Sequence, residues 1–417
     1  MHRRKLNPPG NESEAVDFLV EILEAEGIRY KRLTNPNGRT SLWAGLEAEN
    51  PSGPGLLLIH HIDVVPAGEG WRVEPFSGRL RDGEIWGRGA IDVKSLGIAH
   101  LAVLVDLKRR GVTLERDVAM LAVADEEVGG REGMGWLVDA HPELLDVGGA
   151  LNEGGLNRVL FDRVLWWGVE IAQKRPLWLR LRVRGRGGHA SNLAPESPTH
   201  RLIHSLARLI DRPTRFRVDP VVRRTLGAQA MLEGGRARQS FEQLDEIIAS
   251  DAPVPRLPMG WPAFLTDTIQ VTRLDTSDSI NVIAAEAVAY VDIRLLPETD
   301  DEAFLEEVRE RLGPAVQVEV LLRAPRSAPS PTDHELYRLL EEVLGVRAPV
   351  IPTMVSGVTD ARWLRERGVP VYGIAPFSLS GEESQGIHAR NESISQDELL
   401  RGIEMMRRIV GRWTGVE

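Results

Sequence analysis

The chain has 417 residues, a formal net charge of −10 and no cysteine. The absence of cysteine excludes a disulfide scaffold, a thiolate metal site and a cysteine nucleophile, so any metal ion must be bound by His, Asp and Glu. The acidic balance argues against a nucleic-acid partner, which requires a basic surface.

Helices and strands alternate along the first 173 residues. A helix is predicted to begin at Asn11, which forms a capping-box pattern with Glu14, and to end at Gly27. A second helix is predicted over 95–110. Extended or buried strands are predicted over 40–46, 55–59, 118–124 and 149–151. This alternation predicts an α/β fold with a mostly parallel sheet and helices on both faces.

The pattern changes near Lys174, where apolar and polar residues begin to alternate with a period of two. Such alternation is typical of strands with one solvated face. The predicted strands are 177–183, 268–274, 287–295 and 316–322, and the predicted helices are 198–210 and 300–312. Residues 174–327 are therefore predicted to form an inserted α+β domain. The stretch 212–262 stays unassigned.

Two helices, a strand over 369–374 and a terminal helix are predicted after residue 327. The simplest topology is a discontinuous catalytic domain, residues 1–173 and 328–417, interrupted by the insert. The basic start of the chain is not followed by an apolar run of secretory-signal length, and no window resembles a membrane span. We therefore expect a cytoplasmic protein without a membrane partner.

Histidines and acids gather where the apolar strands end. In open α/β sheets this edge is the usual ligand site. The candidates are His61, Asp63, Asp92, Glu126, Glu127, Glu153 and His388. Each has an ordinary structural alternative: Asp63 could cap backbone groups beside His61, Asp92 could cap the next helix, and the paired glutamates could be a solvated charge run. Together they predict a divalent metal site, with zinc as the leading candidate.

The order of these residues resembles the dizinc aminoacylase/carboxypeptidase family, which includes aminoacylase, carboxypeptidase S, glutamate carboxypeptidase and succinyl-diaminopimelate desuccinylase. The similarity spans nearly the whole chain. The matching segments are His61-x-Asp63-Val64-Val65-Pro66, Gly87-Arg88-Gly89-x-x-Asp92-x-Lys94, Asp125-Glu126-Glu127-x-Gly129, Asn152-Glu153-Gly154-Gly155, Gly187-Gly188-His189-Ala190-Ser191, Asn281-Val282-Ile283 and Gly386-x-His388-Ala389-x-x-Glu392.

The resemblance implies two metal ions, zinc or alternatively cobalt or manganese. By position, His61, Asp92 and Glu153 would bind one ion, and Asp92, Glu127 and His388 would bind the other. Glu126 would act as general base, and Asp63 would support the His61 imidazole. One departure is His60, since most relatives have a small residue before the ligand histidine.

The inserted domain would act as a lid and mediate a homodimer, again by resemblance. His189 would help to stabilise the oxyanion, often across the subunit interface. Arg294, in the family's R-x-x-P pattern, would clamp a substrate carboxylate with Asn281 as a polar helper. Arg362, in the Gly357-x-Thr359-Asp360-x-Arg362 segment, is a second candidate for that carboxylate.

The function that follows is metal-dependent hydrolysis of the amide bond of an N-acyl amino acid or small peptide with a free carboxylate. A biosynthetic deacylase of the desuccinylase or acetylornithine deacetylase type is the alternative within enzymes. An inactive peptide- or metal-binding protein is the alternative from another class, and the presence of Glu126 argues against it.

Overall fold

The computed structural model describes residues 7, 10–161, 163–212, 214–249, 257–258, 260–379 and 386–417. Within these residues the chain forms two compact units. The first comprises 1–172, 327–355 and 359–417, and the second comprises 173–326 and 356–358. No helix in the described residues combines the length and apolar content needed to cross a membrane. The catalytic and lid roles of the two units remain predictions.

The first unit is built around a nine-stranded sheet whose main order is β1-β2-β6-β3-β7-β17-β9-β16, with β8 paired to β9. Its helices are α1 (Ser13–Ala25), α2 (Lys94–Arg110), α3 (Trp136–Ala140), α10 (Glu335–Gly345), α11 (Ala361–Arg365) and α13 (Gln396–Trp413), with short helical turns η1 (Glu126–Val128), η2 (Arg131–Gly135) and η3 (Pro142–Leu145). Its sheet strands are β1 (Arg29–Thr34), β2 (Thr40–Leu46), β3 (Leu56–His61), β6 (Val118–Val123), β7 (Gly149–Asn152), β8 (Arg158–Leu160), β9 (Arg163–Gln173), β16 (Val350–Val355) and β17 (Val371–Gly373). A small separate sheet contains β4 (Arg79–Arg81), β5 (Glu84–Trp86) and β18 (Ser393–Ser395).

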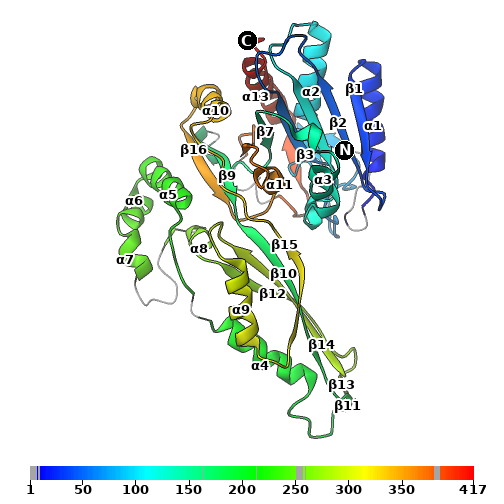
Figure 1. Ribbon diagram of the computed structural model, residues 1–417, viewed down its shortest axis with the longest axis vertical. Helices are drawn as coiled ribbons and strands as arrows, with labels where there is room; N and C mark the ends of the chain where they lie inside the picture. Colours follow the sequence, from blue (N-terminus) through cyan, green and yellow to red (C-terminus); the bar gives the residue numbers. More distant parts are fainter. Residues whose placement is uncertain are drawn as a thin grey trace. The chain divides into compact units, whose positions relative to one another are not determined.

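The predicted α/β fold is confirmed, because the centre of this sheet is parallel and helices cover both of its faces (Figure 1). Alternate residues of β3 explain the continuous apolar run. Leu57 and Ile59 pack in a core with α3 and α11, while Leu56 and Leu58 point to the other face and are equally buried. Antiparallel β1 and β2 extend one side of the sheet.

The predicted start of the first helix is wrong by one residue. The N-cap is Glu12, not Asn11, and no side chain caps the helix. The Asn11 amide instead donates to the Glu14 carboxylate at 3.1 Å. Glu12 pairs with the guanidinium of Arg39, which holds this residue at the helix entrance.

The second unit contains a four-stranded antiparallel sheet in the order β12-β14-β10-β15 (Figure 1). Its strands are β10 (Arg175–Arg184), β12 (Thr268–Asp275), β14 (Glu286–Leu295) and β15 (Gln317–Arg323), and a separate small pair is β11 (Gly188–His189) and β13 (Val282–Ile283). Leu177, Leu179 and Leu181 pack in a core with α4 (Pro198–Ile210) and α9 (Asp301–Leu312). Arg180 on the opposite face pairs with Glu319, as the period of two predicts.

Four helices begin among the described residues of the unassigned stretch 212–262. They are α5 (Pro220–Glu233), α6 (Gly235–Glu242), α7 (Leu244–Ala249) and α8 (Trp261–Phe264). Asp219 caps α5 by accepting a hydrogen bond from the Val221 amide at 2.8 Å. Pro220 follows at the first helical position, where its missing N–H costs nothing.

Candidate metal centre and active site

Three neighbouring parallel strands bring their carboxyl ends to one edge of the sheet in the first unit. His61 is in register with Val123 across β3 and β6, and Leu58 is in register with Leu151 across β3 and β7. The residues that follow these strands therefore lie beside one another. Glu126 and Glu127 follow β6, and Glu153 follows β7.

Asp92 lies between the two candidate histidines. Its Oδ1 is 3.0 Å from Nε2 of His61, and its Oδ2 is 3.0 Å from Nε2 of His388. One carboxylate thus presents a different oxygen to each imidazole. This geometry suits a carboxylate that is shared by two neighbouring cations.

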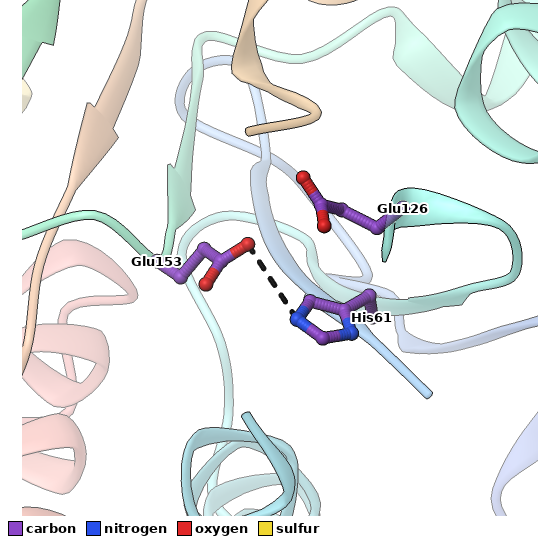
Figure 2. Close-up of side chains that lie close together, drawn as sticks. All are labelled: His61, Glu126 and Glu153. Carbon is purple, nitrogen blue, oxygen red and sulfur yellow. Dashed lines mark ion pairs between the residues drawn. The ribbon is translucent and has the colours of Figure 1, made fainter. Parts of the chain in front are cut away.

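The remaining carboxylates complete a donor set around each histidine. Glu153 Oε1 is 3.7 Å from Nε2 of His61, and Glu127 Oε2 is 3.1 Å from Nε2 of His388. Figure 2 shows the carboxylates of Glu126 and Glu153 pointing into the same space beside the His61 ring. Among the described residues, two sets of donor atoms are close enough to hold a metal ion, namely His61 with Glu126 and Glu153, and His61 with Asp92 and Glu127.

Asp63 fixes the segment that carries the two glutamates. Its carboxylate accepts hydrogen bonds from the backbone amides of Glu126 and Glu127, each at 3.2 Å, and from the side-chain amide of Asn7 at 2.7 Å. His61 Nδ1 lies 3.0 Å from the backbone oxygen of Asp63 and 3.6 Å from its carboxylate. Asp63 therefore contacts both the imidazole and the glutamate turn.

The loop before Asp92 is pinned by a residue from near the C-terminus. The buried Glu392 carboxylate accepts hydrogen bonds from the amides of Gly89, Ile91 and Asp92 at 2.8–3.1 Å and from the Arg88 guanidinium at 2.7 Å. The alternative role of Asp92 as a helix cap is not seen, because α2 is preceded by Val93 and has no side-chain cap.

Burial and mutual repulsion shift the pKa values of this cluster. Burial raises the pKa of Glu126 and of Glu153 well above the usual range, and neighbouring carboxylates add to the effect. Hydrogen bonds to Asp92 and Glu127 raise the pKa of His388 to about 10. Burial opposes protonation of His61, but the surrounding carboxylates outweigh it and raise its pKa. Without cations, the cluster therefore retains protons that metal ions would displace.

Sequence reasoning assigned no role to three residues of this region. Asn7 and Glu392 position the loops that carry the candidate ligands. Asp360 is 1 % exposed, and neither of its carboxylate oxygens has a hydrogen-bond partner among the described residues. Its burial raises its pKa to about 7. Glu392 and Asp360 both stand in the matched motifs, so their positions were available as a clue.

His60 and Arg362 are both buried. The His60 ring turns away from the candidate ligands, and its Nδ1 lies 3.1 Å from Nδ1 of His100 in the core. This agrees with the choice of His61 as the ligand. Arg362 is 1 % exposed and donates to the backbone oxygens of Thr359 and Gly129. Its predicted contact with substrate remains a prediction, and these contacts favour a bracing role instead.

Three predicted residues lie in the second unit. His189 is exposed on β11, and its Nδ1 is 2.8 Å from the Ser191 hydroxyl. The backbone oxygen of Asn281 accepts from the Ala190 amide at 3.0 Å, so the two matched segments are neighbours. Arg294 donates two hydrogen bonds to the Asp292 carboxylate at 2.7 and 2.9 Å. Their predicted contacts with substrate remain untested.

The sequence pattern of Peptidase family M20/M25/M40 matches residues 57–412. This chain belongs to that family. It is therefore a metallopeptidase or amidohydrolase, and the predicted family is confirmed.

Individual relatives agree over nearly the full length. Mouse aminoacylase-1 is 26% identical over 401 residues, which is 94% of this chain and 88% of the relative. An M20 family metallo-carboxypeptidase from Sulfolobus solfataricus has the same fold, with a TM-score of 0.74, 18% identity and coverage of 98% and 96%. A dinuclear metal binding peptidase of the family from Bacillus subtilis has a TM-score of 0.60, with 13% identity and coverage of 100% and 96%.

Proposed function

We propose that the enzyme uses two divalent metal ions to hydrolyse the amide bond of an N-acyl amino acid or small peptide that bears a free carboxylate. The observation that carries the proposal is the Asp92 carboxylate, which presents one oxygen to His61 and the other to His388. Similarity to aminoacylase-1 and to a dinuclear metal binding peptidase supports it.

The donor set fits such a pair of ions. Two imidazole nitrogens and several carboxylates, without thiolates, suit zinc, with cobalt and manganese as alternatives. His61, Asp92 and Glu153 would hold one ion, and Asp92, Glu127 and His388 the other. When bound, the ions would polarise the scissile carbonyl and lower the pKa of a water molecule.

Glu126 is the proposed proton carrier. Its amide is held by Asp63 at 3.2 Å, and its carboxylate points toward the space beside His61 (Figure 2). From this position the carboxylate would take a proton from water and deliver it to the leaving nitrogen. The Asp63 contacts would hold the Glu126 carboxylate in the same position during both proton transfers.

The second unit would supply the groups that recognise the substrate. Arg294 is proposed to bind the substrate carboxylate, for which it would exchange its present Asp292 partner. His189 is proposed to donate to the oxyanion. We also propose that the second unit mediates a homodimer. Its antiparallel sheet has β12 and β15 as edge strands, and an edge strand can pair with a strand of a second copy.

The test is a panel of N-acyl amino acids and dipeptides assayed with zinc, cobalt or manganese, followed by Glu126→Gln. We expect chelator to stop hydrolysis, and Glu126→Gln to keep two ions per chain while kcat falls about 10²- to 10⁴-fold. The exposed Glu69→Gln is the matched control. A near-normal rate for Glu126→Gln would exclude Glu126 as the base. One ion or none per chain in the wild type would exclude the dinuclear site.

A further inference from the structure

A pocket of about 230 Å³ opens directly beside the candidate metal centre of the first unit. Asp92 and Glu153 form one end of it. Most of the other described lining residues are apolar, and they include Leu96, Leu156, Val355, Ile374, Phe377 and Leu379. A group that enters this pocket would therefore be attached close to the bond that is cleaved.

The walls of the pocket are fixed by the fold. Val93, Leu96 and Phe377 belong to one buried core cluster. The ring of Phe377 lies so close to Gly402 that a β-carbon at this glycine would lie 2.2 Å from it. Such packing leaves little freedom for the floor to rearrange, so the pocket is preformed.

Asn157, the one amide side chain among the described lining residues, already has hydrogen-bond partners. Its Nδ2 donates to the backbone oxygens of Ala375 and Phe377 at 2.7 and 3.0 Å, and its Oδ1 accepts from the Gly168 amide at 3.3 Å. Asn157 therefore joins two wall segments. Both hydrogens of its amide nitrogen are used, so only one lone pair of its Oδ1 is left for a ligand.

Charge decides which part of the substrate fits. Among the described lining residues there is no Lys, Arg or His, and the only ionisable groups are the carboxylates of Asp92 and Glu153. The amino-acid half of the substrate carries a carboxylate next to its side chain, and none of the described lining residues offers a cationic side chain to pair with it. The acyl half carries no charge. Two apolar residues at the pocket, Leu156 and Ile387, are 40 % and 42 % exposed, so the apolar surface continues to solvent.

From these observations we infer that the pocket binds the apolar acyl chain of an N-acyl amino acid and makes the enzyme select medium-length or aromatic acyl groups over acetyl. This inference rests on the proposed hydrolytic function and specifies its substrate class. An engineered apolar cavity of about 150 Å³ accepts benzene, so 230 Å³ holds about nine non-hydrogen atoms, the size of an acyl chain near eight to ten carbons.

The test is a series of N-acyl methionines with acyl chains from acetyl to dodecanoyl, assayed with the metal-loaded enzyme. We expect kcat/KM to rise roughly fourfold for each methylene group and to level off near octanoyl to decanoyl. A flat or falling profile in an active enzyme would overturn the inference and leave the proposed function intact. Loss of all hydrolysis across the series and across dipeptides would instead refute the proposed function.

A second series holds the acyl group at acetyl and varies the amino acid from alanine to leucine and phenylalanine. If the apolar preference follows this side chain and ignores the acyl length, the pocket binds the other half of the substrate and the inference is wrong. Binding of N-octanoyl and N-acetyl methionine to Glu126→Gln, measured by calorimetry, gives a readout that needs no turnover. We expect at least tenfold tighter binding of the octanoyl compound.

Leu156→Trp places bulk at the rim of the pocket and should lower the octanoyl-to-acetyl ratio of kcat/KM by at least tenfold. Leu400 is similarly exposed, at 56 %, on the surface of α13 and does not line the pocket. Leu400→Trp is therefore the matched control and should keep the wild-type profile. An unchanged ratio in folded Leu156→Trp would contradict the assignment of the pocket.

Discussion

A buried ion pair in the first unit offers a strong test of how this fold is held together. Glu170 on β9 and Arg365 on α11 are joined by two hydrogen bonds of 2.6 Å, and their side chains are 0 % and 1 % exposed. Arg365 also donates to the Ser330 hydroxyl at 3.0 Å and to the backbone oxygen of Val371 at 2.6 Å. One guanidinium thus connects four segments of the chain.

Arg365→Met would leave the Glu170 carboxylate buried without its cation. We expect a loss of about 3–5 kcal/mol in unfolding free energy at pH 8, because the penalty of burying the charge stays and the attraction disappears. Burial already raises the pKa of Glu170 in the wild type despite the attraction of Arg365, and the substitution raises it further. A carboxyl with a raised folded-state pKa is destabilising once the pH exceeds its unfolded value, so the deficit should be smaller at pH 5 than at pH 8.

Urea unfolding at both pH values measures this loss, and hydrogen exchange of the β9 and β17 amides assigns it to the first unit. The matched control is Arg412→Met, which breaks an exposed 2.7 Å pair with Glu342 and should cost at most about 1 kcal/mol. The double variant Glu170→Met/Arg365→Met removes both charges and should recover most of the loss. If Arg365→Met costs no more than Arg412→Met at pH 8, the reasoning is refuted.

Three further predictions concern the candidate site. Asp63→Asn should lower kcat/KM about 10- to 100-fold, because an amide side chain cannot replace both hydrogen bonds that the carboxylate accepts from the backbone amides of Glu126 and Glu127. Steady-state kinetics measure this loss, and circular dichroism checks that the variant is folded. An unchanged rate would contradict the role of Asp63. Asp360→Asn should raise the melting temperature of the metal-free protein more at pH 8 than at pH 5.5. The pKa of Asp360 is raised from 3.8 to about 7, so this carboxyl destabilises the fold progressively between those two values, and its penalty is only partial at pH 5.5 and complete at pH 8. An equal shift at both pH values would exclude this origin. Zinc should bind more tightly at pH 8 than at pH 6.5 and should release protons on binding, because the pKa of His388 is raised to about 10 in the metal-free cluster. Calorimetry in two buffers of different ionisation enthalpy measures the number of protons released. Binding without proton release would argue against His388 as a ligand.

The parts of the fold that the sequence predicts are those with a simple burial pattern. Val118–Val123 is buried at every position, so its unbroken apolar run marks a central strand. The edge strand Arg29–Thr34 has one buried residue and a polar composition, so no pattern marks it. β9 contains Glu170, a residue that argues against a central strand until its partner Arg365, 195 residues away, is known.

The helices of 212–262 escape sequence reasoning for a related reason. The segment 220–233 has no strong apolar stripe, and its residues Val221, Val222 and Leu226 are buried while most of the others are exposed or half-exposed. The sequence signal for α5 is Asp219 followed by Pro220, which indicates where a helix begins. This signal does not indicate how far the helix extends. Tertiary packing, which is not visible in the sequence, decides the rest.

The candidate site also has a part that the sequence predicts and a part that it does not. The sequence identifies which residue types end the parallel strands, and the parallel register explains why they meet. It cannot show that Asp92 directs one oxygen to each histidine, because this depends on the loop before Asp92. That loop reaches its position through Gly89, whose φ is +80° and where an added β-carbon would lie only 2.7 Å from the Val64 side chain.

The same loop explains why a site begun at His61 needs residues from the end of the chain. Glu392 binds the backbone of the Asp92 loop, and His388, four residues earlier, binds the Asp92 side chain. One short segment therefore fixes both the backbone and the carboxylate orientation of the same residue. Since Arg88 also donates to the backbone oxygen of His388 at 3.2 Å, the two segments hold each other in both directions. A break in either segment should misplace Asp92 relative to both histidines at once, so both halves of the candidate centre depend on this group of contacts between distant parts of the sequence.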